Sequence, residues 1–329
     1  MPINEMPLPS AERRAGYATL LLIALVVLLV GQRGGAQSLS YSRGQNASPA
    51  FEGWEENPDG SFNFLFGYMN RNWEEELDVP VGPDNAIEPG GPDRGQPTHF
   101  LPRRNRFVFK VRVPKEWGEK ELTWTLTTRG KTEKAYATLR TDSKVDDVVK
   151  ASETGALGAG TSSPEVRSNK PPEVKLDGAR TRGTKVGEPL SLVAWVTDDG
   201  IPKQRSIGVD QTTAAARRAE AEGRRVTNPA LVPPQQATVG KRVGLHLSWF
   251  VYRGTGRVTF DPPQIKVWED TRTGSNSPWA PLFKVPEPPQ DGKWVARATF
   301  EEPGTFVLRA RADDGALVCD EDVTVNVTR

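Results

Sequence analysis

The sequence predicts an all-β chain that folds into two antiparallel β-sandwich domains behind an N-terminal signal peptide or anchor helix. Three observations predict this organisation. Short runs with alternating apolar and polar residues recur along the chain, a stretch rich in Gly and Ser divides them into two groups, and two arginines precede an apolar N-terminal segment. The length of 329 residues suits two domains of ordinary size, and the 31 Gly and 28 Pro supply the many turns that short strands need.

The N-terminal segment predicts export. Arg13 and Arg14 precede residues 15–31, which carry no charge, and Gly34 and Ala36 place small residues where a signal peptidase requires them. We expect cleavage after Ala36, which makes residues 1–36 a signal peptide. The alternative is an uncleaved anchor through residues 15–31, at the short end of what spans a bilayer. The remainder is then periplasmic, at the cell surface or secreted, or held outside the cytoplasm by that single span.

Residues 37–140 predict the first sandwich. In three runs, apolar side chains fall on one parity and alternate with mostly polar side chains, Leu65 and Val108 being exceptions, which is the period of a half-buried strand. Turns separate the runs at residues 114–120 and 128–131. The runs are Phe62, Phe64, Phe66 and Tyr68; Phe107, Phe109, Val111 and Val113; and Leu122, Trp124 and Leu126.

Residues 141–170 lose the alternation and predict a linker, and residues 171–329 predict the second sandwich. Alternating runs begin there at Leu190, Leu245, Trp294, Phe306 and Val323. Residues 203–242 interrupt them with three prolines and a net charge of +5, from eight basic and three acidic residues. We interpret this segment as a solvated insertion between strands; the alternative is a basic docking loop for an acidic partner.

Several motifs of the second domain occur in a characteristic order: Asn169-Lys-Pro-Pro-Glu-Val174, Thr197-Asp-Asp-Gly200, and Phe300 to Gly315 followed by Val323-Thr-Val-Asn-Val327. This order resembles the PKD and related immunoglobulin-like modules of bacterial surface proteins. The resemblance implies that the predicted sandwiches are immunoglobulin-like β-sandwich domains. The first domain, at residues 66–72 and 95–102, resembles segments of uncharacterised exported bacterial proteins, a likeness that implies no activity.

Charge is balanced overall but divided locally. The formal net charge of +1 excludes a strong field for nucleic acid. Residues 52–93 carry eleven acids against Arg71 alone, whereas residues 94–115 carry seven bases and no acid. We expect neighbouring strands and loops to neutralise one another through cross-strand pairs.

The alternative for the acidic run is a Ca²⁺ site, since hard cations prefer several carboxylate and carbonyl oxygens in a flexible loop. Its candidate ligands are Asp84, Asn85, Glu88 and Asp93. Two Asp-Asp-Gly motifs add Asp198, Asp199, Asp313 and Asp314, although an Asp-Gly turn explains these equally. No metal other than calcium and no further cofactor is expected.

Nine tryptophans raise the alternative of carbohydrate binding. Trp124 and Trp249 lie on the apolar parity of their runs and predict core positions. The candidates for ligand contact lie in turn-rich surroundings and are Trp54, Trp73, Trp268 and Trp279.

No catalytic residues are predicted, and the chain is expected not to be an enzyme. Only His99 and His246 are available as bases near neutral pH, and no nucleophile elbow, zinc motif or phosphate loop is present. We expect His246 to face outward with Ser248. Cys319 is the single cysteine, so it is either an inert buried thiol or a site of intermolecular pairing.

These expectations combine into an exported, non-catalytic binding, adhesion or scaffold protein of the cell envelope. Its partner would be an envelope protein or glycan, and it would touch membrane only through residues 15–31 if these are not removed. The alternatives are a carbohydrate-binding module and a metal-assisted or carboxylate-based hydrolase of envelope glycans, with carboxylates drawn from Glu74, Glu75, Glu76 and Asp78.

Overall fold

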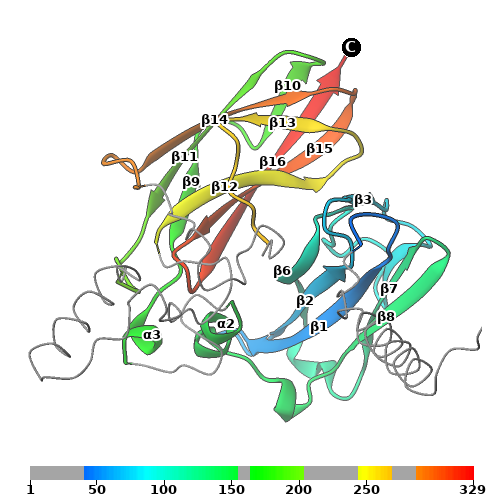
Figure 1. Ribbon diagram of the computed structural model, residues 1–329. Coiled ribbons are helices and arrows are strands. Elements are labelled where there is room, and N and C mark those ends of the chain that lie inside the picture. Colours follow the sequence, from blue (N-terminus) through cyan, green and yellow to red (C-terminus); the bar gives the residue numbers. More distant parts are fainter. Residues whose placement is uncertain (1–40, 155–163, 204–243, 269–286) are drawn as a thin grey trace, which may run out of the picture. The chain divides into compact units, whose positions relative to one another are not determined.

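The structure is a computed structural model that describes residues 41–154, 164–203, 244–268 and 287–329 (Figure 1). The predicted signal peptide or anchor, nearly all of the 203–242 insertion and Trp279 lie outside these residues. Residues Tyr41–Arg329 form one compact unit that contains two large hydrophobic cores. The all-β prediction with two sandwiches is confirmed.

The first sandwich consists of two three-stranded sheets, ordered β1-β2-β6 and β4-β7-β8, and a two-stranded ribbon of β3 and β5. All neighbouring strands are antiparallel. A 3₁₀ turn, η1 (Lys115–Trp117), separates β6 from β7. The strands are β1 (Ala47–Glu56), β2 (Phe62–Asn70), β3 (Leu77–Asp78), β4 (Asn85–Glu88), β5 (His99–Phe100), β6 (Arg103–Val113), β7 (Leu122–Thr128) and β8 (Lys131–Ala137).

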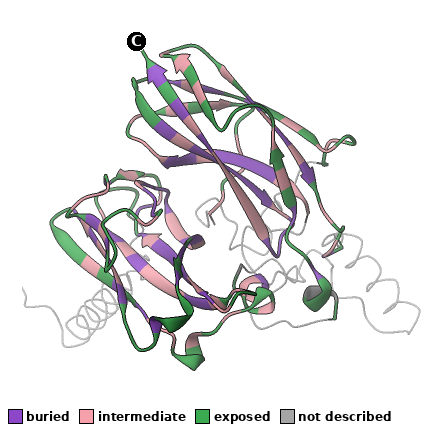
Figure 2. Cartoon of the chain, turned by 180° about the vertical axis from the view of Figure 1, so that it is seen from behind, coloured by how far each residue is buried: buried purple, intermediate pink, exposed green. Residues whose placement is uncertain are grey.

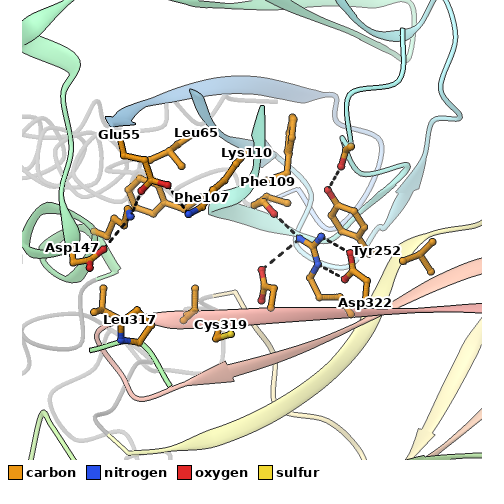
Figure 3. A pocket seen from close by; sticks show the side chains of 18 of the residues that line it. Glu55, Leu65, Phe107, Phe109, Lys110, Asp147, Tyr252, Leu317, Cys319 and Asp322 are labelled. Carbon is orange, nitrogen blue, oxygen red and sulfur yellow. Dashed lines mark hydrogen bonds and ion pairs between the residues drawn. The ribbon is translucent and has the colours of Figure 1, made fainter. Parts of the chain in front are cut away.

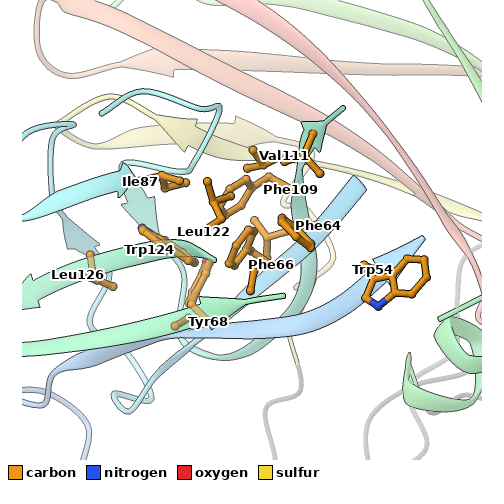
Figure 4. Close-up of a cluster of buried hydrophobic side chains, with 14 of the residues drawn as sticks. Trp54, Phe64, Phe66, Tyr68, Ile87, Phe109, Val111, Leu122, Trp124 and Leu126 are labelled. Atoms are coloured by element: carbon orange, nitrogen blue, oxygen red, sulfur yellow. The ribbon is translucent and has the colours of Figure 1, made fainter. Parts of the chain in front are cut away.

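Aromatic side chains fill the core of the first sandwich (Figure 4). Phe66 stacks on Phe109 with ring centroids 5.3 Å apart, and Trp124 meets Phe109 edge-on at 5.0 Å. The indole N–H of Trp124 donates to Oδ1 of the buried Asn85, 2.9 Å away. The alternation in the sequence therefore predicted this core correctly, since Phe64, Phe66, Leu122, Trp124 and Leu126 are fully buried.

One alternating run is broken by a β-bulge. Three residues of β6, Arg106 to Val108, lie opposite the single residue Gly67 of β2. Phe107 adopts a φ of 50°, in the left-handed region, and is only half-buried, whereas Val108 is buried. The prediction that Phe107 shares the core face with Phe109 is wrong, because the bulge resets the period of two.

The second sandwich has sheets ordered β13-β14-β11-β9 and β10-β16-β15-β12. This is the strand order of an immunoglobulin constant-type domain, with an added strand, β10, pairing parallel to β16. Figure 2 shows buried and less buried residues alternating along these strands. The strands are β9 (Glu173–Leu176), β10 (Thr181–Lys185), β11 (Leu190–Thr197), β12 (His246–Arg253), β13 (Val258–Asp261), β14 (Lys293–Phe300), β15 (Gly304–Asp313) and β16 (Val318–Thr328).

The core of the second sandwich contains Trp249 on β12, where an immunoglobulin domain places its buried tryptophan. No disulfide supports it, because Cys319 on β16 is the only cysteine and is free. The same core cluster includes Leu192 of β11, Ala296 of β14, Leu308 of β15 and Val325 of β16. This sandwich is therefore stabilised by packing and other noncovalent contacts, without a covalent cross-link.

Residues 141–145 of the predicted linker lie against the first sandwich. A 3₁₀ turn, η2 (Thr141–Ser143), leads to Lys144, which bridges to Trp54, and the N–H of Val145 donates to the carbonyl of Trp54 at 2.9 Å. Two helices follow, α2 (Asp147–Thr154) and α3 (Pro164–Ser168). The exact domain boundary within 141–170 stays a prediction.

Candidate functional site: the joint between the sandwiches

The end of β12 inserts into the first sandwich and forms the joint between the two cores. Tyr252 belongs to the second sandwich by sequence but is 3% exposed and lies in the core cluster of the first. Its hydroxyl donates to the carbonyl of Gly95 at 2.5 Å, and its own carbonyl accepts the N–H of Thr98 at 3.2 Å. The N–H of Gly254 donates to Oγ1 of Thr98 at 3.1 Å.

Arg253 binds the same loop of the first sandwich. Its guanidinium makes a bidentate pair with Asp93, at 3.0 and 2.8 Å, and its Nε donates to the carbonyl of Gln96 at 2.8 Å. The hydrogen bonds from Arg253 lower the pKa of Asp93. Bidentate geometry fixes direction as well as distance, so this pair orients the loop relative to β12.

A second arginine crosses the joint from β15. Arg309 is buried, and its Nη1 donates to the carbonyl of Val108 on the bulge of β6 at 2.6 Å. Asp322 on β16 accepts two further hydrogen bonds, at 2.8 and 2.9 Å, and the guanidinium lies 3.5 Å from the ring centre of Tyr252. Burial alone would lower the pKa of Arg309, but the hydrogen bonds to Asp322 and the charge of Asp320 hold it above its usual value.

Arg311 repeats this arrangement two residues further along β15. It pairs with Asp320 at 2.8 and 2.7 Å and lies 5.6 Å from the ring centre of Phe250. Burial opposes ionisation of Asp320, but the charge and hydrogen bonds of Arg311 lower its pKa overall. Charges buried in this way are tolerated because each has an opposite charge and directed hydrogen bonds.

A cleft of about 940 Å³ lies beside this ladder of arginines and aspartates (Figure 3). On its other wall, Glu55 pairs with Lys110 at 2.6 Å and with Lys150, which also reaches Asp147 at 3.1 Å. Burial would raise the pKa of Glu55, but the hydrogen bonds from the two lysines bring it down to about 2. On each wall of the cleft, the charged groups are thus neutralised by partners on the same wall.

Helix α2 closes one end of the joint. Its Ala151 is 1% exposed and packs with Ala316 and Leu317 from the turn between β15 and β16. Its Glu153 pairs with Arg106 on the bulge at 2.6 Å. A segment with linker composition therefore contributes a small apolar contact and ion pairs to the joint.

The predicted charge neutralisation within the first sandwich is confirmed in part, by pairs that run from β1 and its following turn to β6, two strands that lie on either side of β2 and are not direct neighbours. Glu52 pairs with Arg104 at 2.5 Å, Glu55 with Lys110, and Asp59 with Arg112. For Glu52, burial outweighs the opposing effect of Arg104 and Arg106 and raises the pKa of its carboxyl.

Two of the four candidate calcium ligands of the acidic run have other partners. Asp93 binds Arg253, and the side chain of Asn85 is buried, donating to the carbonyls of Val79 and Pro97. Glu88 ends β4, and Asp84 precedes it in an exposed turn. In the parts of the chain that the structure describes, no three His, Cys, Asp or Glu side chains gather closely enough to hold a metal ion.

The two Asp-Asp-Gly motifs form the turns expected of them. Asp198 and Asp199 accept the N–H groups of Gly200 and Ile201, each at 2.9 Å. Asp313 accepts the N–H of Gly315, and Asp314 accepts those of Ala316 and Leu317. Side chains that accept nearby backbone N–H groups are typical of Asx turns.

The tryptophans proposed for ligand contact differ in how far they are buried. Trp54 is only 6% exposed, and its indole N–H donates to the carbonyl of Arg140 at 2.7 Å, so its predicted exposure is wrong. The turn-rich sequence around it misled because Trp54 lies inside β1. Trp73 is half-buried beneath the guanidinium of Arg103 at 4.0 Å, and Trp268 is half-buried near Lys266.

The two histidines also differ from expectation. His99 is 6% exposed and lies between Asp78, 2.6 Å from Nδ1, and Glu76, 3.0 Å from Nε2. Burial would lower its pKa, but these two carboxylates raise it to about 9. Ser248 is buried, so the prediction that it faces outward with the half-buried His246 is wrong.

Cys319 lies on β16 and lines the cleft. It is half-buried, and burial raises the pKa of its thiol. A raised pKa reduces the thiolate fraction and so favours the interpretation of an inert thiol.

The described residues contain no helix that is both long and apolar enough to cross a membrane.

The fold defines an all-β protein with two immunoglobulin-like sandwiches. No protein-family model and no curated protein matches the chain. Among solved structures, it is similar to the N-terminal eight Ig domains of Down Syndrome Cell Adhesion Molecule, with 9% identity, a TM-score of 0.21, and coverage of 86% of this chain and 27% of that one. It is similar to Sidekick-1 immunoglobulin domains 1–4 as well, with 8% identity, a TM-score of 0.21, and coverage of 87% of this chain and 50% of that one.

It is also similar to the Yersinia pseudotuberculosis adhesin InvE, with 10% identity, a TM-score of 0.21, and coverage of 89% of this chain and 62% of that one. The chain covers 27% of the Down Syndrome Cell Adhesion Molecule structure and 50% of the Sidekick-1 structure, so it spans less than two thirds of the length of either. With TM-scores this low, the assignment of the fold rests on the strand order of the chain itself.

Proposed function

We propose that this chain is an exported, non-catalytic binding or scaffold protein of the cell envelope. The observation that supports this most is the joint, in which Tyr252, Arg253 and Arg309 of one sandwich are bound by backbone carbonyls and a carboxylate of the other. Such a joint holds two sandwiches as one body and leaves their outer faces and loops for partners. Export is supported by the basic and apolar pattern of the N-terminal segment.

The acidic residues considered for hydrolysis support the same proposal. Glu76 and Asp78 both bind His99, and Glu75 pairs with Arg129. A carboxylate that serves as general acid or nucleophile must reach substrate in a pocket, whereas these serve as partners for cations.

Two measurements test the proposal. The full-length protein is expressed in a bacterial host, and intact cells are treated with protease before and after the envelope is opened. We expect the chain in the envelope or external fraction; retention in the cytoplasm would contradict export.

Purified protein is then incubated with isolated envelope, which is sedimented while the supernatant is assayed for new reducing ends. We expect co-sedimentation without release of sugar. Release that disappears in Glu76→Gln, but persists in the control Glu116→Gln at an exposed position, would establish the hydrolase instead.

A further inference from the structure

The outer face of the sheet β13-β14-β11-β9 carries a tryptophan between two lysines. On β11, Trp195 is paired in register with Lys293 of β14 on one side and with Lys175 of β9 on the other. The alternation of β11 and β14 directs Leu192, Ala194, Ala296 and Ala298 into the core, so the opposite parity lies on the outside. Trp195 is half-buried, and both lysines are exposed.

Trp195, Lys175 and Lys293 form a surface patch, called the platform below, in which both lysine charges lack an ion-pair partner among the described residues. The Nζ of Lys293 lies 5.8 Å from the ring centre of Trp195, within the range of a cation–π contact. Neither Lys175 nor Lys293 has an ion pair with a residue that the structure describes. Nearby Arg297 is paired with Asp261 at 2.7 Å, so the remaining charges of this face are the two lysines and the exposed Glu173, two residues before Lys175 on β9.

An apolar strip continues from the indole. Val193 and Val295 are paired across β11 and β14, and Val295 is 53% exposed, more than most large apolar side chains of the described chain. Val193 is two residues from Trp195 along β11, and Val295 is two residues from Lys293 along β14, so all four lie on the same face. The surface thus offers a flat apolar area bordered by ammonium groups rather than a pocket.

We propose that this face binds an acidic polysaccharide. A sugar ring places its C–H face on an indole, and carboxylate or sulfate groups on the same or the next residue then meet an ammonium group on either side. Neighbouring strands are about 4.8 Å apart, so one ring on Trp195 lies within reach of both lysines. The inference rests on the proposed envelope location and names the ligand class for that binding role.

A polysaccharide fits better than an acidic protein surface because the platform is narrow and has one aromatic anchor. A stable protein interface needs about 800 Å² on each partner with a well-packed centre. A flexible anionic chain instead needs only small contacts that repeat along it, because several weak contacts together raise the overall affinity.

The test uses polygalacturonate as the acidic polysaccharide, dextran as the neutral one and polyglutamate as a polypeptide of the same charge. Binding to the full-length protein is followed by calorimetry at low and high salt. We expect polygalacturonate to bind, dextran not to bind, and polyglutamate to bind at least tenfold more weakly. Equal binding of polyglutamate, or no binding of polygalacturonate, would overturn the inference.

Variants assign the binding to this face. Trp195→Ala is expected to weaken polygalacturonate at least tenfold, and the double variant Lys175→Gln, Lys293→Gln is expected to remove its salt dependence. Tyr136→Ala and Lys134→Gln, exposed on β8 of the other sandwich, are the matched controls and should change nothing.

Because the lysine variants alter only exposed side chains, they remain informative if Trp195→Ala unfolds. Undiminished binding in the lysine variants would place the ligand elsewhere and refute the assignment. The fractionation experiment above is independent of these outcomes, so a failure of the glycan site and a failure of the proposed function are distinguishable.

Discussion

Asp314 connects three segments of the second sandwich through one residue. Its Oδ1 accepts the N–H groups of Ala316 and Leu317 at 2.6 and 2.7 Å, its Oδ2 accepts a hydrogen bond from Asn169 at 3.0 Å, and its carbonyl accepts the N–H of Gly244 at 3.1 Å. Burial raises the pKa of this carboxyl to about 7. The ionised form is therefore disfavoured in the folded chain despite its hydrogen bonds.

Stability should fall as pH rises through the pKa of Asp314. The folded pKa lies above that of an unfolded aspartate, about 3.9, so the stabilising contribution is complete below pH 4 and is lost as pH rises through 7. In Asp314→Asn this dependence should vanish, and the variant should be more stable than the parent at pH 8. Asn169 now donates from Nδ2 to this carboxylate; once its side-chain amide turns over, its Oδ1, which is buried without a hydrogen-bond partner, can accept from the new amide.

Chemical unfolding at pH 5 and pH 8 measures the effect, with Asp313→Asn as the control. Each pH unit across the transition is worth at most about 1.4 kcal/mol. A parent and Asp314→Asn with parallel pH profiles would contradict the assignment of a near-neutral pKa to this carboxyl.

His99 should produce a second loss of stability at alkaline pH. Its folded pKa of about 9 is above the unfolded value of about 6.5, so its contribution is complete below pH 6.5 and is lost as pH rises through 9. The contribution is up to roughly 3 kcal/mol, since two carboxylates bind the imidazolium in a buried position. His99→Gln should be less stable at pH 6.5, and the difference from the parent should close by pH 10.

Calcium should leave the protein unchanged. Of the residues predicted as ligands, Asp93 and Asn85 are bound to other groups, and the remaining carboxylates do not gather in threes within the described chain. We expect the same thermal midpoint in EDTA and in millimolar Ca²⁺, since only a ligand that prefers the native state raises it. A clear rise with Ca²⁺ would restore the cation site that the acidic sequence predicted.

At the scale of elements, the sequence predicted the long strands because one parity of each run is apolar and lies in a core. The runs at Phe62, Leu122, Leu190 and Phe306 all became strands with the expected face in a core. The short ribbon of β3 and β5 was not predictable, since two-residue strands carry no periodicity. The bulge at Arg106 to Val108 was missed for a related reason, because it keeps apolar residues on both parities.

The joint was missed although its residues carry a visible pattern. Arg309 and Arg311 alternate with the core alanines of β15, and Asp320 and Asp322 alternate in the same way on β16. Such a pattern predicts cross-strand ion pairs on a wet face. That this face is covered depends on Val108 of the β6 bulge, 201 residues from Arg309, and on the loop at Gly95, 157 residues from Tyr252, and a pattern local to one strand cannot contain such distant partners.

Gly67 is required by the bulge, and its replacement should destabilise the first sandwich. A Cβ at this position would collide with the carboxylate of Glu52 and the carbonyl of Asn105. Because one obstacle is backbone, Gly67→Ala should lower the free energy of unfolding by about 1–3 kcal/mol. Gly82→Ala is the matched control, since a Cβ there meets nothing within 4 Å; equal losses in both variants would refute a steric requirement at Gly67.

For the whole molecule, Tyr252 decides whether the two cores unfold together. It is carried by β12, whose neighbours Val251 and Trp249 lie in the second core, while its own ring lies in the first. It also holds Arg309 against Val108, since the guanidinium lies over its ring. One side chain therefore couples hydrophobic burial in one sandwich to an ion-pair ladder on the other.

Tyr252→Ala should separate the unfolding of the two sandwiches. Removing a buried aromatic ring costs about 3–5 kcal/mol, and here that loss falls on contacts between the cores. We expect the parent to unfold in one calorimetric transition and the variant in two, with hydrogen exchange assigning the earlier one to a single sandwich. Tyr136→Ala, whose ring is 54% exposed, should keep one transition. If Tyr252→Ala also unfolds in a single step at a lower temperature, cooperation between the sandwiches depends on Arg253 and Arg309 instead, since their backbone and carboxylate contacts would then suffice to transmit unfolding from one core to the other.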